Sequence, residues 1–140
     1  KNKNKIVVGC DTVIDLGGKM IVKVNNKINA EKKIKKLSGK KHKIITSVSV
    51  YYNTKLLWFL SEKTKVEIRR LNSIQIKKYL NSCGSDVLNS VGCYQLERSG
   101  PLIIKNIKGD FFNVMGFPLF PFLNFLNNVD VGRLKKIYGV

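Results

Sequence analysis

The stretch that decides the fold is HKIITSVSVYYNTKLLWFLSEKTKVEI, residues 42–68. Residues 42–52 and 55–68 are two long runs rich in β-branched and aromatic side chains, which favour strands. Apolar and polar residues alternate in the first run, as is typical of a strand with one buried face. Asn53 and Thr54 separate the runs in the way that a tight turn does. The stretch therefore predicts one long antiparallel hairpin.

The segment before this hairpin predicts two strands and a helix. Residues 6–14 form a short apolar, β-branched run, which indicates a buried strand. Residues 15–18 predict a hairpin turn, and residues 20–22 a short return strand. We expect Asn29 to cap a helix that Gly39 ends. The inward face of that helix is predicted to carry Ala30, Ile34 and Leu37.

The segment after the hairpin predicts two further helices and a strand. Ser73 is expected to cap a helix with Ile76 and Leu80 inward. A short helical turn at 86–91, a strand at 102–107 and an apolar helix at 117–126 follow. No linker interrupts the chain, so we expect one α/β domain over residues 1–140, with a mixed sheet and flanking helices.

The formal net charge is +17, from 22 Lys and 4 Arg against 9 acidic residues. A cationic chain can bind nucleic acid by displacing the counterions of the phosphates. Here the lysines are spread along the chain rather than set in a block with interleaved aromatic residues. This pattern disfavours nucleic acid as the main partner. A basic field would still attract a small polyanion such as a nucleotide.

The cysteine and hydropathy patterns indicate the cellular compartment of the protein. Cys10, Cys83 and Cys93 lack metal-ligand spacing and His42 is the only histidine, so a structural zinc site is disfavoured. Free buried thiols in a reducing cytoplasm are the simpler interpretation. No apolar run is long enough to cross a bilayer. We therefore expect a cytoplasmic protein with no membrane partner.

Asp11 is the first candidate for chemistry, because it lies inside an apolar strand. A carboxylate buried there costs free energy unless it is paired, neutral or bound to a cation. It is either a Mg²⁺ ligand or general base beside a polyphosphate, or a strand-end aspartate bonded to a loop; the residues alone leave both open. The hairpin can return Lys23 close to Asp11, where an ammonium would neutralise charge on a leaving phosphate. Equally, Lys23 is one solvated lysine among many.

A second candidate segment is GCYQLE, residues 92–97. It joins a glycine, an aromatic ring and polar groups, which can stack on a nucleobase and bond to its edge. The competing interpretation is a simple turn in which Tyr94 is a core residue.

Together these motifs resemble one family, the Maf-like (septum-formation-inhibitor-like) nucleoside triphosphate pyrophosphatases. Residues 9–13 (GCDTV) look like the family's G-A-D-T-V strand. Residues 37–46 look like L-S-G-x-x-H-x-x-x-T, and residues 92–100 like A-G-x-Y-x-x-Q/E-G-x-G. Residues 113–119 (NVMGFPL) look like N-V-V-G-L-P-L. The match is colinear over residues 6–126, and residues 88–97 look like an alphaproteobacterial subgroup.

The resemblance implies a Maf/ITPase-like fold with two lobes and a central cleft. It implies hydrolysis of nucleoside triphosphates, including non-standard ones such as 7-methyl-GTP, to the monophosphate and pyrophosphate. A divalent cation, Mg²⁺ or Mn²⁺, would assist, and the protein could pair as a homodimer. By position, Asp11 would be the catalytic or metal-binding carboxylate and Lys23 a catalytic phosphate contact. Thr12, Tyr94 and Glu97 would bind the substrate, since a carboxylate can accept from the N1 and N2 donors of guanine.

Three departures qualify this expectation. The family's S-x-S-P-R-R phosphate-binding motif does not occur, so we expect an N-terminally truncated domain with little or no activity alone. The G-K-P turn reads Val22-Lys23-Val24, and Arg98 replaces a glycine and would place a long cation at the base pocket. A catalytically decayed nucleotide-binding protein and a basic nucleic-acid-binding module therefore stay open as alternatives.

Overall fold

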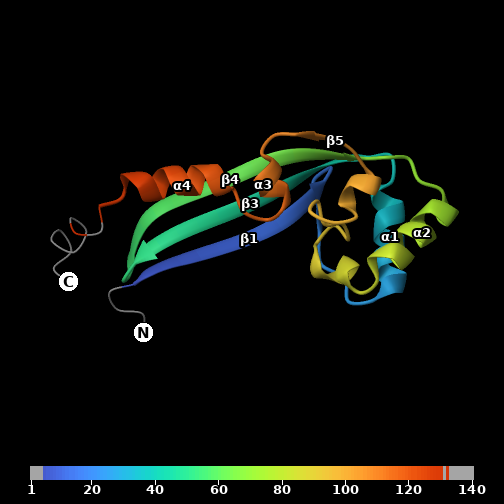
Figure 1. Ribbon diagram of the computed structural model, residues 1–140, viewed down its shortest axis with the longest axis horizontal. Coiled ribbons are helices and arrows are strands. Elements are labelled where there is room, and N and C mark those ends of the chain that lie inside the picture. The colour runs from blue at the N-terminus through green and yellow to red at the C-terminus, as the bar shows by residue number, and fades with distance from the viewer. Residues whose placement is uncertain (1–4, 131, 133–140) are drawn as a thin grey trace.

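The computed structural model describes residues 5–130 and 132, and a five-stranded sheet in the order β2-β1-β3-β4-β5 forms its centre (Figure 1). The strands are β1 (Ile6–Leu16), β2 (Lys19–Ile21), β3 (Lys41–Tyr52), β4 (Lys55–Ile68) and β5 (Ile104–Lys108). Every strand pair within the described residues is antiparallel. The predicted α/β class and long hairpin are confirmed. The expectation of a mixed sheet is wrong for these strands: β1–β2 and β3–β4 are hairpins, and the β1–β3 and β4–β5 pairs, whose strands are separated by helices in the chain, are antiparallel as well.

Strands β3 and β4 form the predicted hairpin, and β3 shows the predicted alternation of buried and less buried residues. Alternate residues of β3, from His42 to Tyr52, are buried, so one face of the strand meets the rest of the molecule. Asn53 has φ 55°, a left-handed conformation that asparagine tolerates, and it begins the turn. At the other hairpin, Gly17 and Gly18 have φ 61° and 85°, as a tight turn between β1 and β2 requires.

The predicted burial of β1 is wrong. Of residues 6–14 only Ile14 is buried, and Asp11 is exposed. The reason is that residues 6–13 form an edge of the sheet beyond the reach of β2, and the two helices that bury the core lie at the other end of the sheet. Burial therefore imposes no cost on the Asp11 carboxylate.

Two longer helices, α1 (Lys27–Leu37) and α2 (Ser73–Cys83), cover one end of the sheet (Figure 1). The cap of α1 is Asn26, whose side chain accepts from the backbone N–H of Asn29, so the predicted cap lies three residues too late. Asn72 caps α2 reciprocally with Gln75, and the predicted cap Ser73 is the first helical residue. The predicted inward faces are confirmed. The core between these helices and the sheet includes Ala30, Ile34, Leu37, Val66, Ile76 and Leu80.

The remaining elements are short, apart from α4 (Leu119–Asn128). They are two 3₁₀ turns, η1 (Asp86–Asn89) and η2 (Gly100–Leu102), and α3 (Phe111–Val114). Helix α4 lies along the part of the hairpin that extends away from α1 and α2 (Figure 1). Trp58 of β4 stacks on Phe125 of α4 with ring centroids 5.3 Å apart. No helix among the described residues is long and apolar enough to span a bilayer.

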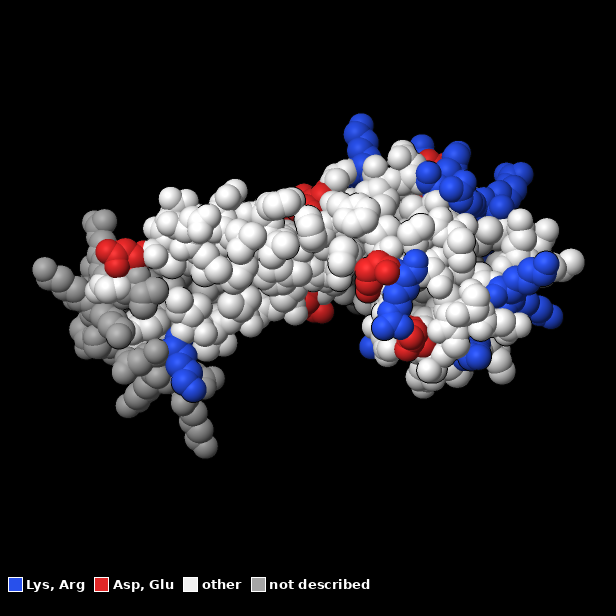
Figure 2. Space-filling model, in the orientation of Figure 1, with Lys and Arg blue, Asp and Glu red and all other residues white. Residues whose placement is uncertain are grey.

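Basic side chains are unevenly distributed over the face of the molecule that Figure 2 shows. Figure 2 shows Lys and Arg side chains gathered at the end of the molecule that carries α1 and α2, whereas the surface over α4 shows few charges in this view. On this face of the molecule the basic side chains are therefore concentrated at the helical end.

Candidate functional site

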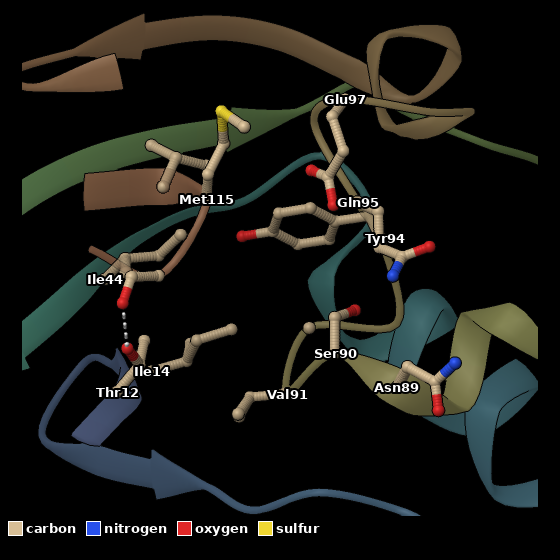
Figure 3. Close-up of a pocket in the computed structure, with 13 residues that line it drawn as sticks. Thr12, Ile14, Ile44, Asn89, Ser90, Val91, Tyr94, Gln95, Glu97 and Met115 are labelled. Atoms are coloured by element: carbon tan, nitrogen blue, oxygen red, sulfur yellow. Dashed lines mark hydrogen bonds between the residues drawn. The ribbon is translucent and has the colours of Figure 1, made fainter. Parts of the chain in front are cut away.

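A cavity of about 210 Å³ lies between the sheet and the loop after η1 (Figure 3). Four segments that are distant in sequence line it: Thr12 and Ile14 of β1, Ile44 of β3, residues 89–97 except 93 and 96, and residues 114–116. Thr12, Tyr94 and Glu97, which the resemblance assigned to substrate binding, are all in the lining. The fold thus brings these three side chains to one place.

Thr12 is held at the floor of the cavity by its hydroxyl. Its Oγ1 lies 3.0 Å from Oγ1 of Thr46 and 3.5 Å from the carbonyl oxygen of Gly116. Thr46 is fully buried and in turn approaches the carbonyl of Asn113 at 3.5 Å. These contacts join β1, β3 and the segment after α3 directly beneath the cavity.

Tyr94 forms a wall of the cavity and is anchored from behind. It is only 4% exposed, and its hydroxyl lies 2.5 Å from Nε2 of His42 on β3. Burial lowers the pKa of His42 from 6.5 to about 4 and raises the pKa of Tyr94 above its usual value. The imidazole and the phenol are therefore both neutral at physiological pH. Such a pair can fix a ring but would not supply a charge.

The loop that carries Tyr94 depends on unusual backbone geometry. A Cβ atom on Gly92 would overlap the Tyr94 ring, so only glycine fits there. Cys93 has φ 58°, a strained conformation for a residue with a side chain. The hydroxyl of Tyr79 on α2 donates to the Cys93 carbonyl at 3.1 Å and helps to hold this turn. Of the three thiols, which were all expected to be buried, Cys93 is buried and Cys10 is exposed.

Glu97 and its neighbours form the polar side of the cavity. Glu97 is exposed, and Figure 3 shows its carboxylate directed toward the space between Tyr94 and Gln95. The Oγ atom of Ser90 is buried in the lining and has no hydrogen-bond partner within the described residues. No sequence motif singled out Ser90, because a lone serine in a turn carries no distinctive signal.

Arg98 is not at this cavity, contrary to the expectation of a cation at the base pocket. Its guanidinium pairs with the carboxylate of Asp86 in η1. Both side chains lie in the lining of a separate small cavity beside α2. The turn from Gln95 to Gly100 points these two neighbours, Glu97 and Arg98, to different sides.

Asp11 and Lys23 lie outside the lining of the cavity. Asp11 neighbours Thr12 on β1, and its Oδ1 accepts from the backbone N–H of Thr12 at 2.9 Å. Lys23 is exposed in the loop after β2, and no ion pair joins it to Asp11 in the structure. The return strand ends at Ile21, so strand pairing does not carry Lys23 back along β1 as expected. Ile21, two residues before Lys23, pairs with Ile14, three residues after Asp11, so Lys23 follows in the loop on the Asp11 side of that pair.

Beside Thr12 the structure presents the Asp11 carboxylate as a candidate metal ligand, and the described residues form no cage of ligands around it. No group of three or more His, Cys, Asp or Glu side chains gathers within residues 5–130. Mg²⁺ in nucleotide sites is commonly held by one or two carboxylates together with substrate phosphates and water. An exposed Asp11 is compatible with that form of binding.

Comparison with known proteins identifies the relatives of this fold. A family model described as Maf-like protein matches residues 1–129. The chain is 40% identical over 126 residues to the 7-methyl-GTP pyrophosphatase of Bartonella quintana (strain Toulouse), covering 90% of this chain and 64% of the relative. It is 33% identical over 121 residues to a nucleoside triphosphate pyrophosphatase of Caulobacter vibrioides, covering 86% and 61%. The chain thus spans less than two thirds of the length of these relatives.

Proposed function

Because the chain belongs to the Maf-like protein family, we propose that it hydrolyses nucleoside triphosphates to the monophosphate and pyrophosphate. The observation that carries this proposal is the convergence of Thr12, Tyr94 and Glu97 on one cavity. Two motifs that are distant in sequence supply these residues: residues 9–13 contribute Thr12, and residues 92–97 contribute Tyr94 and Glu97. The relatives named as pyrophosphatases support the reaction class.

We propose that the cavity receives the nucleobase rather than the whole nucleotide. Its volume of about 210 Å³ is below the roughly 300–1,000 Å³ of most small-ligand sites. Tyr94 would pack against the base, Glu97 would accept from the N1 and N2 donors of guanine, and Ser90 would offer a further hydroxyl. A 7-methylated guanine carries positive charge, which a carboxylate and an aromatic ring both favour. This chemistry supports 7-methyl-GTP as the preferred substrate.

With the base bound in the cavity, the triphosphate would extend out of it past Thr12, toward the exposed part of β1. There Asp11 would serve as the general base for the attacking water or as a ligand of the divalent cation, and Lys23 would contact the phosphates. A bound Mg²⁺ or Mn²⁺ would neutralise charge on the phosphate oxygens. We further propose that full activity needs an N-terminal phosphate-binding segment of the kind the family carries.

The decisive experiment measures pyrophosphate release from a panel of standard and modified nucleoside triphosphates with Mg²⁺ or Mn²⁺. It compares the chain as it stands with a version fused to the N-terminal portion of the Bartonella quintana relative. We expect turnover by the fused version with Asp11 intact, little or none by the chain alone, and a loss of at least about 100-fold in the fused Asp11→Asn variant, as for other general bases. Glu31→Gln, an equal charge change on α1, is the control and should keep full activity.

Other outcomes select the alternatives. Tight nucleotide binding with no pyrophosphate from either version would indicate a decayed binding protein. Affinity for nucleic acid that falls steeply with salt, with no response to nucleotides, would indicate a nucleic-acid-binding module. Full turnover by Asp11→Asn would remove Asp11 from the mechanism.

A further inference from the structure

Lys33 differs from the other lysines of α1. Lys27, Lys32, Lys35 and Lys36 are exposed, whereas Lys33 is 7% exposed and lies on the inward face with Ala30, Ile34 and Leu37. Burial lowers the pKa of its amine. An amine taken from water costs free energy unless its protons find acceptors. The hydrogen-bond acceptors of the Lys33 amine therefore indicate what this buried lysine holds together.

The Lys33 amine bonds to two backbone carbonyls that belong to different parts of the site. Its Nζ donates to the carbonyl of Val22, directly before Lys23, and to the carbonyl of Val91 at 2.7 Å. Val91 lines the cavity, between Ser90 and Gly92. Hydrogen bonds from an ammonium are roughly twice as strong as those between neutral groups. One side chain thus fastens the loop that bears Lys23 to the wall of the base cavity.

The loop after β2 is held in part by Val24, which packs partly buried against the hydrophobic core, but Val24 is not in the lining of the cavity. The loop follows a strand of three residues and contains no helix until α1 begins at Lys27. Its composition, Val22-Lys23-Val24-Asn25, includes no proline to limit its backbone freedom. The hydrogen bond from the Lys33 amine fixes the Val22 carbonyl, which belongs to the peptide bond before Lys23. The Lys23 side chain takes no part in this bond and stays available to a ligand.

We propose that Lys33 is a positioning residue that holds the Lys23 loop at a fixed separation from the cavity wall at Val91. A nucleotide with its base in the cavity would then meet the Lys23 ammonium at its phosphates. This inference rests on the proposed function for the roles of the cavity and of Lys23. The tether by Lys33 rests only on its hydrogen bonds to the Val22 and Val91 carbonyls. The tether and the proposed function can therefore fail independently of each other.

The test is a double-mutant cycle with Lys33→Met, an uncharged side chain of similar length. The affinity for a non-hydrolysable nucleoside triphosphate is measured for the parent, Lys23→Ala, Lys33→Met and the double variant. We expect Lys23→Ala to weaken binding about tenfold in the parent and less than about twofold after Lys33→Met, a coupling typical of residues in one network. Lys32→Met, an equal charge change on the exposed face of the same helix, should leave the Lys23 effect at its parental size.

Hydrogen exchange supplies a readout that needs no nucleotide. Amides in residues 22–26 and 90–92 should lose protection in Lys33→Met and keep it in Lys32→Met. Equal Lys23 effects in both backgrounds, or unchanged protection of both segments, would overturn the proposal. Lost protection in a protein that binds no nucleotide would retain the tether and reject the function assigned to the site. The Met variant is expected to fold, because Met is a good helix former whose flexible side chain fills the space of the Lys33 stem, and its melting curve checks this.

Discussion

The Nε2 atom of His42 lies 2.5 Å from the hydroxyl oxygen of Tyr94, so strand β3 of the long hairpin directly supports the aromatic wall of the cavity. His42 is 3% exposed and comes from the start of β3, 52 residues before Tyr94. The hairpin therefore does more than form the sheet: it fixes the ring that the base would contact.

This pair makes stability depend on pH in a defined direction. Burial lowers the pKa of His42 from 6.5 to about 4, so between these values the unfolded chain binds a proton that the folded chain does not. Stability is full above pH 6.5 and falls as the pH decreases toward 4, by about 3 kcal/mol in total. The free energy of unfolding in denaturant, measured at pH 7.5 and 4.5, checks this. His42→Gln, which does not titrate, should lose less over this range, while equal losses would show that His42 already charges in the folded state.

Gly92→Ala should displace the Tyr94 ring, because the added methyl would overlap it. Overpacking of this kind costs typically 1–3 kcal/mol, and we expect about 2 kcal/mol together with weaker nucleotide binding. Gly9→Ala is the matched control: its new Cβ would lie 3.2 Å from Oγ of Ser49, a side chain that can rotate away. Calorimetric melting and nucleotide titration of both variants test the difference. Equal behaviour of the two would mean that the Tyr94 ring moves freely.

The long hairpin and the inward faces of the helices could be predicted because they follow from local periodicity. The alternation of apolar and polar residues at 42–52 shows which face of β3 is buried, and this does not depend on which segment packs against that face. The helix caps were displaced by one and three residues, since neighbouring Asn and Ser side chains compete for one role. Asn26 prevails over Asn29 through its bond to the Asn29 amide.

Burial of single residues could not be predicted, because it depends on which segment packs against them. The apolar run at 6–14 indicated a buried strand, yet most of it lies at the edge of the sheet, away from the end that α1 and α2 cover. Lys33 lies in a lysine-rich helix, and only the fold distinguishes it from its exposed neighbours. Likewise the motifs grouped Thr12, Tyr94 and Glu97 through the family resemblance, whereas Ser90 became a candidate only through the shape of the cavity.

Asn113 should be one of the residues least tolerant of a new charge. It is fully buried, and its Nδ2 donates to Oγ1 of Thr64 at 3.0 Å and to the carbonyl of Ile44 at 3.4 Å. Asn113→Asp keeps the shape but sets a carboxylate against that carbonyl, and we expect a loss of about 3–5 kcal/mol at neutral pH. Asn124→Asp, on the exposed side of α4, should change stability by less than about 0.5 kcal/mol. Denaturant unfolding at pH 7 compares them, and similar midpoints would contradict the buried network.

Arg98→Ala should leave nucleotide affinity within about twofold of the parent, because Arg98 pairs with Asp86 and lies outside the cavity. The pair is exposed, so stability should change by less than about 1 kcal/mol. Glu97→Ala, one residue away, should weaken binding of 7-methyl-GTP by about tenfold or more, since it removes an acceptor for the base. Titration calorimetry with 7-methyl-GTP and UTP separates these effects. If Arg98→Ala and Asp86→Ala weakened binding as strongly as Glu97→Ala, the ion pair would be orienting the turn, and Arg98 would belong to the site after all.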